Sequence, residues 1–235
     1  MTAPDVEAIH RGLVERLTAE LRPVRRLWSP WQRLVAWVGF ALATVGFAAL
    51  VGLRHDLVLE LARPRYVLSL VILLAGAGLG ATVALLGAVP GRIGNRQVRR
   101  IGFGLLLLAV TAALLGDPVA AHRPTPELFL TGARCTACVA LFGLVPWLLL
   151  FRAVARAAPL DGRLAGLAVG VAGFLVGAAA VRVACPIDDV VHLALWHGTP
   201  VALWTAASTV AGGTWLARWL GPAVTATDEV ASASA

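Results

Sequence analysis

The sequence predicts an all-α membrane protein, a bundle of six transmembrane helices preceded by a short amphipathic helix. Hydrophobic residues make up 59% of the 235 residues and charged residues only 14%, and the mean hydropathy is +0.81. A soluble domain of this size needs more polar surface than this composition supplies. The charges also separate apolar stretches that are long enough to cross about 30 Å of hydrocarbon.

The first predicted element is an amphipathic helix over residues 5–21, which we expect to end near Pro23 because proline disfavours helical geometry in the preceding residue. Its polar side mixes acids with Arg11. A helix that seeks lipid would be richer in basic residues, so the pattern favours docking into a protein groove over adsorption to the membrane, although both stay open. The apolar positions that would serve as anchors are Val6, Ile9, Leu13, Leu17 and Leu21.

The predicted spans follow in order as 34–53, 66–90, 101–116, 135–151, 164–181 and 198–217. The third and fourth are short, so they would need small tilts or polar ends. No Asp, Glu or Arg occupies the middle of a span, which argues against an ion-coupled transporter. The fifth span carries Gly166, Gly170, Gly173 and Gly177 along one face, a spacing that predicts close helix packing.

The arginines predict the orientation of the bundle. With six spans both termini lie on one side, and that side holds 14 of the 20 arginines. The positive-inside rule therefore places both termini in the cytoplasm, and the charged first 30 residues show no cleavable signal peptide. The net charge of +7 is scattered through short loops, so it does not indicate direct binding of nucleic acid.

This topology divides the chain into three parts and collects its reactive side chains. Residues 1–33 form a cytoplasmic segment, 34–217 form the bundle, and 218–235 form a short polar tail that we expect to be disordered. The side chains that fall at the outer ends of the spans are Cys135, Cys138, Cys185, His192 and His197.

Four stretches carry a resemblance to a known family. They read LRPVRRLWSPWQRL at 21–34, APLDGRLAGLAVGVAGFLVGAAA at 158–180, RVACP around Cys185, and LALWHGTP around His197. Together they resemble the NrsF family of bacterial membrane anti-sigma factors over about residues 10 to 220. The resemblance implies a six-helix inner-membrane protein whose N-terminal segment keeps an extracytoplasmic-function (ECF) sigma factor from RNA polymerase. It also implies that Cys135 and Cys185 sense heavy-metal or oxidative stress, with Cys138 as an addition to the family pattern.

Two chemistries are open at the outer face. Cys135 or Cys138 could form a disulfide with Cys185. Alternatively, the three thiols with His192 or His197 could bind zinc, cadmium or copper(I) transiently, with no obligatory cofactor.

Each of these residues also has an ordinary structural explanation that involves no sensing chemistry. Cys185 could be a small buried apolar residue. The two histidines lie five residues apart, a spacing that does not place two ligands on one face of an α-helix, so the sequence favours interfacial positions for them. Asp188 and Asp189 would either attract a cation or cap the following helix.

The sequence-based hypothesis is thus a non-enzymatic membrane anti-sigma factor with an ECF sigma factor and membrane lipids as partners. The alternative is a membrane thiol oxidoreductase that uses Cys135 and Cys138 as an active pair and passes electrons to a quinone. That alternative explains a Cys-x-x-Cys motif but gives the amphipathic N-terminus no role.

Overall fold

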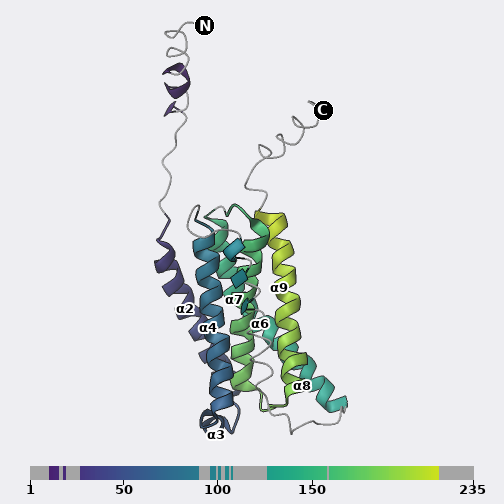
Figure 1. The fold of residues 1–235 in the computed structure, drawn as a ribbon. Coiled ribbons are helices and arrows are strands. Elements are labelled where there is room, and N and C mark those ends of the chain that lie inside the picture. Colours follow the sequence, from purple (N-terminus) through teal and green to yellow (C-terminus); the bar gives the residue numbers. More distant parts are fainter. Residues whose placement is uncertain are drawn as a thin grey trace, which may run out of the picture.

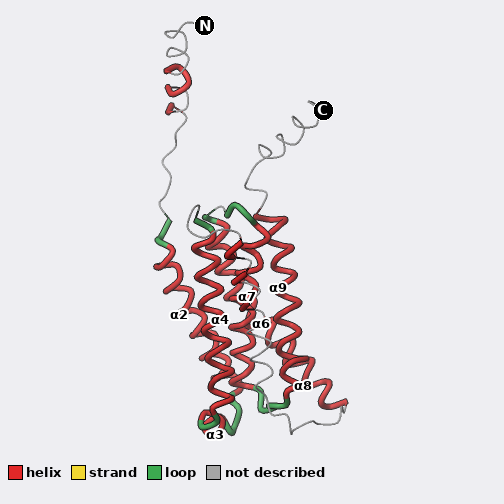
Figure 2. The backbone as a smooth tube through the Cα atoms, in the orientation of Figure 1, coloured by secondary structure: helices red, strands yellow, loops and turns green. Residues whose placement is uncertain are grey.

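A computed structural model describes residues 11–15, 18–19, 27–89, 96–98, 100–101, 104–105, 107, 126–157 and 159–216. Within these residues the elements are helices, and the long ones pack side by side in a bundle (Figures 1 and 2). In chain order they are α2 (Pro30–Gly52), α3 (Leu57–Leu61), α4 (Pro64–Gly87), α6 (Pro126–Ala155), α7 (Gly162–Ala184), α8 (Val190–His192), the π-helix η1 (Leu193–Gly198), α9 (Thr199–Ala211) and the π-helix η2 (Gly212–Leu216).

Four helices are long and apolar enough to cross a membrane, namely Pro30–Gly52, Pro64–Gly87, Phe129–Ala155 and Gly162–Ala184. They correspond to the first, second, fourth and fifth predicted spans. The first begins earlier than expected because Ser29 and Gln32 form a reciprocal capping box ahead of Pro30. The sequence suggested that the fourth span is short, but the helix is long. It continues beyond both predicted ends and accommodates Pro146 in its interior.

The other predicted elements are covered less completely. Most of 101–116 lies outside the described residues, so the third span stays a prediction. The sixth coincides with an uninterrupted helical run from Val190 to Leu216, made of α8, η1, α9 and η2, and its crossing of a membrane also stays a prediction. The tail 218–235 and most of 5–21 fall outside the described residues, although 11–15 are helical.

Helix α7 is the central element of the bundle, buried along nearly its whole length and packed against α2, α4, α6 and α9. Its glycines permit close helix packing, as the sequence predicted, and they do so against two different helices. Gly166 and Gly170 lie against the α9 backbone near Ser208, whereas Gly173 and Gly177 lie against α6. The close approach is fixed by Ser208, whose hydroxyl donates to the carbonyl of Gly166 at 2.7 Å.

We expect the Gly177→Ala variant to be less stable than the wild type by about 1–3 kcal/mol, the usual cost of overpacking. A Cβ at Gly177 would overlap the carbonyl oxygen of Val139 and the backbone of Gly143. Thermal unfolding of the purified protein in detergent measures the effect. Gly78→Ala is the matched control, since a Cβ there meets nothing within 4 Å, and equal melting temperatures for the two variants would contradict the packing argument.

Candidate functional site

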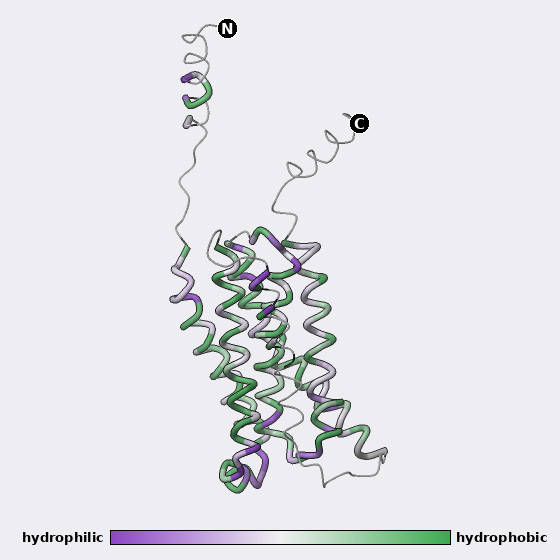
Figure 3. The backbone as a smooth tube through the Cα atoms, viewed as in Figure 1, coloured by the Kyte–Doolittle hydropathy of each residue, from purple (hydrophilic) through white to green (hydrophobic). Residues whose placement is uncertain are grey.

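Helices α3 and α8 lie at one end of the bundle, which we call the α3 end (Figure 1). Hydrophilic residues are conspicuous in the loops there, while the helix shafts are mostly hydrophobic (Figure 3). This is the end that the arginine distribution predicts to face outward. Two groups of side chains occupy it.

The first group, the thiol–imidazole cluster, consists of Cys135, Cys185, His192 and His197. One ligand atom from each residue can be chosen so that all four lie within 4.8 Å of one another, and all four residues are buried. The two Sγ atoms are 3.6 Å apart, and Cys185 Sγ lies 3.5 Å from Nε2 of His192. The structure therefore brings together four of the five residues that the sequence offered as metal ligands.

Helix geometry explains why the two histidines meet despite their spacing. Leu193–Gly198 is a π-helix, in which the backbone bonds run from i to i+5, so residues five apart lie on one face. The rings of His192 and His197 consequently pack edge to face with centroids 5.4 Å apart. The interfacial interpretation of these histidines assumed an α-helix, and the π-helix replaces it with two buried imidazoles side by side.

Two contacts hold the histidine segment in place. Asp189 accepts a hydrogen bond from the backbone N–H of His192 at 2.9 Å and so caps the start of α8, one of the two roles considered for it. On the other side, the hydroxyl of Thr136 donates to the carbonyl of Trp196 at 3.2 Å. The Trp196 ring lies where a Cβ on Gly132 would be, so this glycine lets η1 approach α6.

The electrostatics of the cluster favour a cation. The hydrogen bond from the Cys135 thiol, followed by the contacts with His192 and His197, lowers the pKa of the Cys185 thiol, although burial acts in the opposite direction. Nδ1 of His192 and Nε2 of His197 are buried and have no hydrogen-bond partner among the described residues. Unpaired buried imidazole nitrogens are unusual, and a lone pair on either could bind a metal ion.

The observed distances suit tetrahedral coordination. With Zn–S of about 2.3 Å and Zn–N of about 2.0–2.1 Å, tetrahedral angles put two sulfur ligands about 3.8 Å apart and a sulfur and a nitrogen about 3.5 Å apart. The cluster has 3.6 Å and 3.5 Å. Two thiolates and two neutral imidazoles would also cancel the charge of a divalent ion, which matters because an unbalanced buried charge is costly.

Cys138 is not one of the four clustered residues. It is half-buried one turn along α6 from Cys135 and packs against the hydrophobic core. All three cysteines are free thiols. The Cys-x-x-Cys motif therefore does not act as one unit here, because Cys135 faces Cys185 across the helix interface instead.

The second group, the Arg54 network, was not predicted from the sequence. Arg54 is buried and donates to Asp56 and to Asp188 at 2.6–3.2 Å, with Glu60 3.8 Å away. Arg182 also pairs with Asp188. The signal in the sequence was the pair of stretches RHDLVLELARPR and RVACPIDD, which place acids and arginines at one end of the bundle.

This network ties the loop after α2 to the end of α7. The Arg54 N–H donates to the carbonyl of Val183 at 3.3 Å, and the guanidinium groups of Arg54 and Arg182 lie over the Tyr66 ring at 5.4 and 4.6 Å. Asp188 accepts from both arginines, so its partner cations are guanidinium groups. It does not cap α8, and it lies three residues from Cys185, so the network fixes the loop that carries this thiol.

Of the five residues predicted to bind a sigma factor, the structure describes one. Val6, Ile9, Leu17 and Leu21 lie outside the described residues. Leu13 is described and is 53% exposed, and its neighbour Val14 is 54% exposed. The predicted anchor Leu13 and the neighbouring Val14 are therefore both exposed within the described part of the chain.

The long apolar helices and the buried cluster at one end define a helical membrane protein with a candidate thiol and imidazole site. The family described as "Negative regulator of sigma F" (NrsF) matches residues 17–219, and the chain belongs to this family. Membership confirms the resemblance found in the sequence and implies a negative regulator of a sigma factor. No curated protein and no solved structure matches the chain.

Proposed function

We propose that this chain is a non-enzymatic inner-membrane anti-sigma factor, with both termini in the cytoplasm, that sequesters an ECF sigma factor through residues 1–33. It releases the sigma factor when the thiol–imidazole cluster binds a soft metal ion or is oxidised. Family membership supports the regulatory role. The observation that carries the sensing proposal is the convergence of two thiols and two imidazoles from α6, the end of α7, α8 and η1 within 4.8 Å.

The two chemical signals act on the same sulfur atoms. A zinc, cadmium or copper(I) ion would displace the thiol protons and bridge the four residues. Hydrogen peroxide would instead oxidise the thiols of Cys135 and Cys185 to a disulfide, taking two electrons and two protons and leaving two waters. The sulfur atoms would close from 3.6 Å to about 2.0 Å. The disulfide would therefore draw the α6 and α7 segments together at the α3 end, whereas a metal ion would tie α6, α7, α8 and η1 to one another through the four residues.

Helix α6 offers a mechanical route to the opposite end. Along its length the indole N–H of Trp37 donates to the carbonyl of Pro146 at 2.8 Å, and Arg33 donates to the carbonyl of Ala153 at 2.9 Å. Both donors lie on α2, where the segment that would hold the sigma factor joins the bundle. A hundredfold loss of affinity needs only about 2.8 kcal/mol of coupling between the two ends.

Burial of the cysteines favours sensing over thiol oxidoreductase chemistry. Cys135 is 8% exposed and Cys185 is 4% exposed. An enzyme that exchanges disulfides with protein substrates needs an accessible attacking thiolate, and its expected pair, Cys135 with Cys138, is not the pair that the fold brings together.

The sigma-factor proposal predicts that the full-length tagged protein, purified in mild detergent, captures one ECF sigma factor from the same cell. We expect the Leu13→Asp, Leu17→Asp variant to lose capture at least about 100-fold, because each buried aliphatic anchor contributes roughly 1.5–3 kcal/mol and a carboxylate cannot replace it.

The matched control is Leu160→Asp, which places the same carboxylate on an exposed leucine between α6 and α7 and should retain capture. Co-purification followed by quantitative immunoblotting measures both. Capture of no sigma factor by the wild type, or equal capture by the double variant, would refute the proposal.

A further inference from the structure

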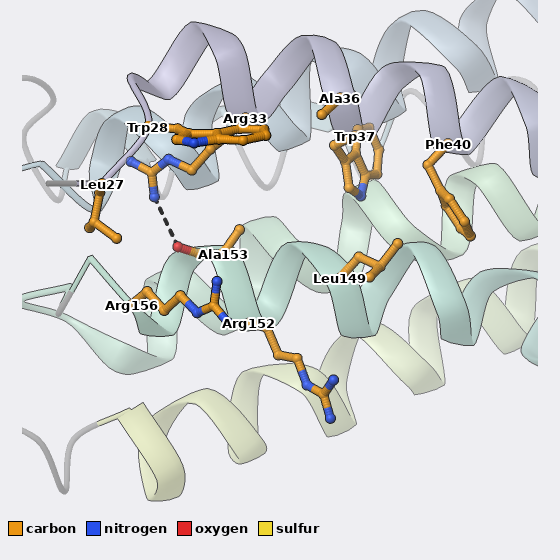
Figure 4. A pocket seen from close by; sticks show the side chains of 10 residues that line it. All are labelled: Leu27, Trp28, Arg33, Ala36, Trp37, Phe40, Leu149, Arg152, Ala153 and Arg156. Carbon is orange, nitrogen blue, oxygen red and sulfur yellow. Dashed lines mark hydrogen bonds between the residues drawn. The ribbon is translucent and has the colours of Figure 1, made fainter. Parts of the chain in front are cut away.

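At the end opposite α3 the bundle has a groove between α2 and α6 with a volume of about 910 Å³ (Figure 4). Its lining has two parts. Trp37, Phe40 and Leu149 form an apolar wall that runs along the helices, and arginines stand at its mouth. None of the described residues that line it is acidic, so the groove combines an apolar channel with a positively charged entrance.

Two of the arginines suit an anion at that entrance. Arg33 extends from α2 and Arg156 from the turn after α6, on the two sides of the groove, whereas the Arg152 side chain points away from α2 (Figure 4). Arg33 uses one terminal nitrogen to bind the carbonyl of Ala153, which fixes its guanidinium at the mouth. Its Nε is buried and has no hydrogen-bond partner among the described residues, so donors remain for a ligand.

We propose that this groove binds one anionic phospholipid, with its phosphate at Arg33 and Arg156 and an acyl chain along Trp37, Phe40 and Leu149. The apolar wall belongs to two helices that are long enough to span the bilayer, so an acyl chain can reach it from the membrane. Basic pockets between transmembrane helices bind anionic head groups through guanidinium–phosphate contacts. A protein segment is a less favourable occupant than an acyl chain. It would have to displace membrane lipid from the exposed side chains of Phe40 and Leu149.

The test titrates the full-length detergent-solubilised protein with dioleoylphosphatidylglycerol and, separately, with dioleoylphosphatidylcholine, and counts one-to-one adducts by native mass spectrometry. We expect the wild type to prefer phosphatidylglycerol. In the Arg33→Gln, Arg156→Gln variant its affinity should fall about 30-fold, from roughly 1 kcal/mol per arginine. Binding of phosphatidylcholine, whose ammonium group offsets the charge of its phosphate, should fall much less.

Two further variants keep the test decisive. Arg96→Gln, Arg163→Gln removes the same charge from two exposed arginines outside the groove and should change affinity by less than about 2-fold. Ala36→Leu fills the groove while keeping both arginines and should weaken both lipids. Equal phosphatidylglycerol binding by the wild type and the Arg33, Arg156 variant would overturn the proposal. So would an equal loss in the Arg96, Arg163 variant.

Discussion

Replacing Cys185 by serine is expected to lower the affinity of the purified protein for cadmium by about 100-fold or more. Structural thiolate and imidazole sites bind zinc-class ions with roughly 10–16 kcal/mol over four ligands, so one ligand accounts for about 3 kcal/mol, equivalent to a factor of about 100. Cys185 contacts both Cys135 and His192, so its loss opens the centre of the site. The thiolate-to-cadmium charge-transfer absorbance, titrated to one ion per chain, measures the effect.

Cys138→Ser is the matched control, because it makes the same chemical change three residues from Cys135 at a thiol outside the cluster. We expect it to keep the wild-type affinity and, in cells, the wild-type induction of the sigma-dependent promoter by cadmium. Cys185→Ser should bind the sigma factor normally and lose induction. If Cys138→Ser lost cadmium binding while Cys185→Ser kept it, the assignment of the site would be wrong.

Replacing Asp188 by asparagine is expected to destabilise the protein by about 3–5 kcal/mol, the usual cost of removing one partner from a buried ion pair. Asp188 is the carboxylate shared by Arg54 and Arg182, both of which are buried. Its loss leaves one cation without compensation. Thermal unfolding in detergent at neutral pH measures the change, and a loss below about 1 kcal/mol would contradict the argument.

Asp56→Asn provides the comparison for that experiment. Asp56 binds the same Arg54, but its side chain is 31% exposed against 17% for Asp188, so water can replace more of the lost interaction. We expect a clearly smaller drop in the melting temperature. Equal drops for both variants would show that burial of the Asp188 contact does not determine its contribution.

The Asp188 contribution should also depend on pH. Burial alone would raise its pKa, but the hydrogen bonds from Arg54 and Arg182 outweigh burial and hold it below the ordinary value of 3.8. A carboxyl whose pKa is lower in the folded state stabilises the fold above its unfolded pKa and loses that effect as the pH falls through the folded pKa. The difference in melting temperature between the wild type and Asp188→Asn should therefore shrink as the pH is lowered below 3.8.

Much of the candidate site was within reach of the sequence, and its limits have identifiable causes. The arginine distribution placed Cys135, Cys185, His192 and His197 at one end of the bundle. The sequence could not say which thiol faces Cys185, since Cys135 and Cys138 are one turn apart on the same helix. It also favoured interfacial positions for the histidines, because their five-residue spacing was judged against α-helical geometry and η1 is a π-helix.

The sequence by itself determined the class of this protein. Long uncharged stretches can satisfy their backbone hydrogen bonds in a bilayer only as helices, and the glycines of α7 marked where helices approach closely. Only the tertiary structure decided which side chains meet. The contacts of Arg54 with Asp188, of Cys135 with Cys185, and of Arg33 with Ala153 join residues 50 to 134 positions apart. Such pairings depend on how the helices rotate and slide against one another, which local periodicity does not encode.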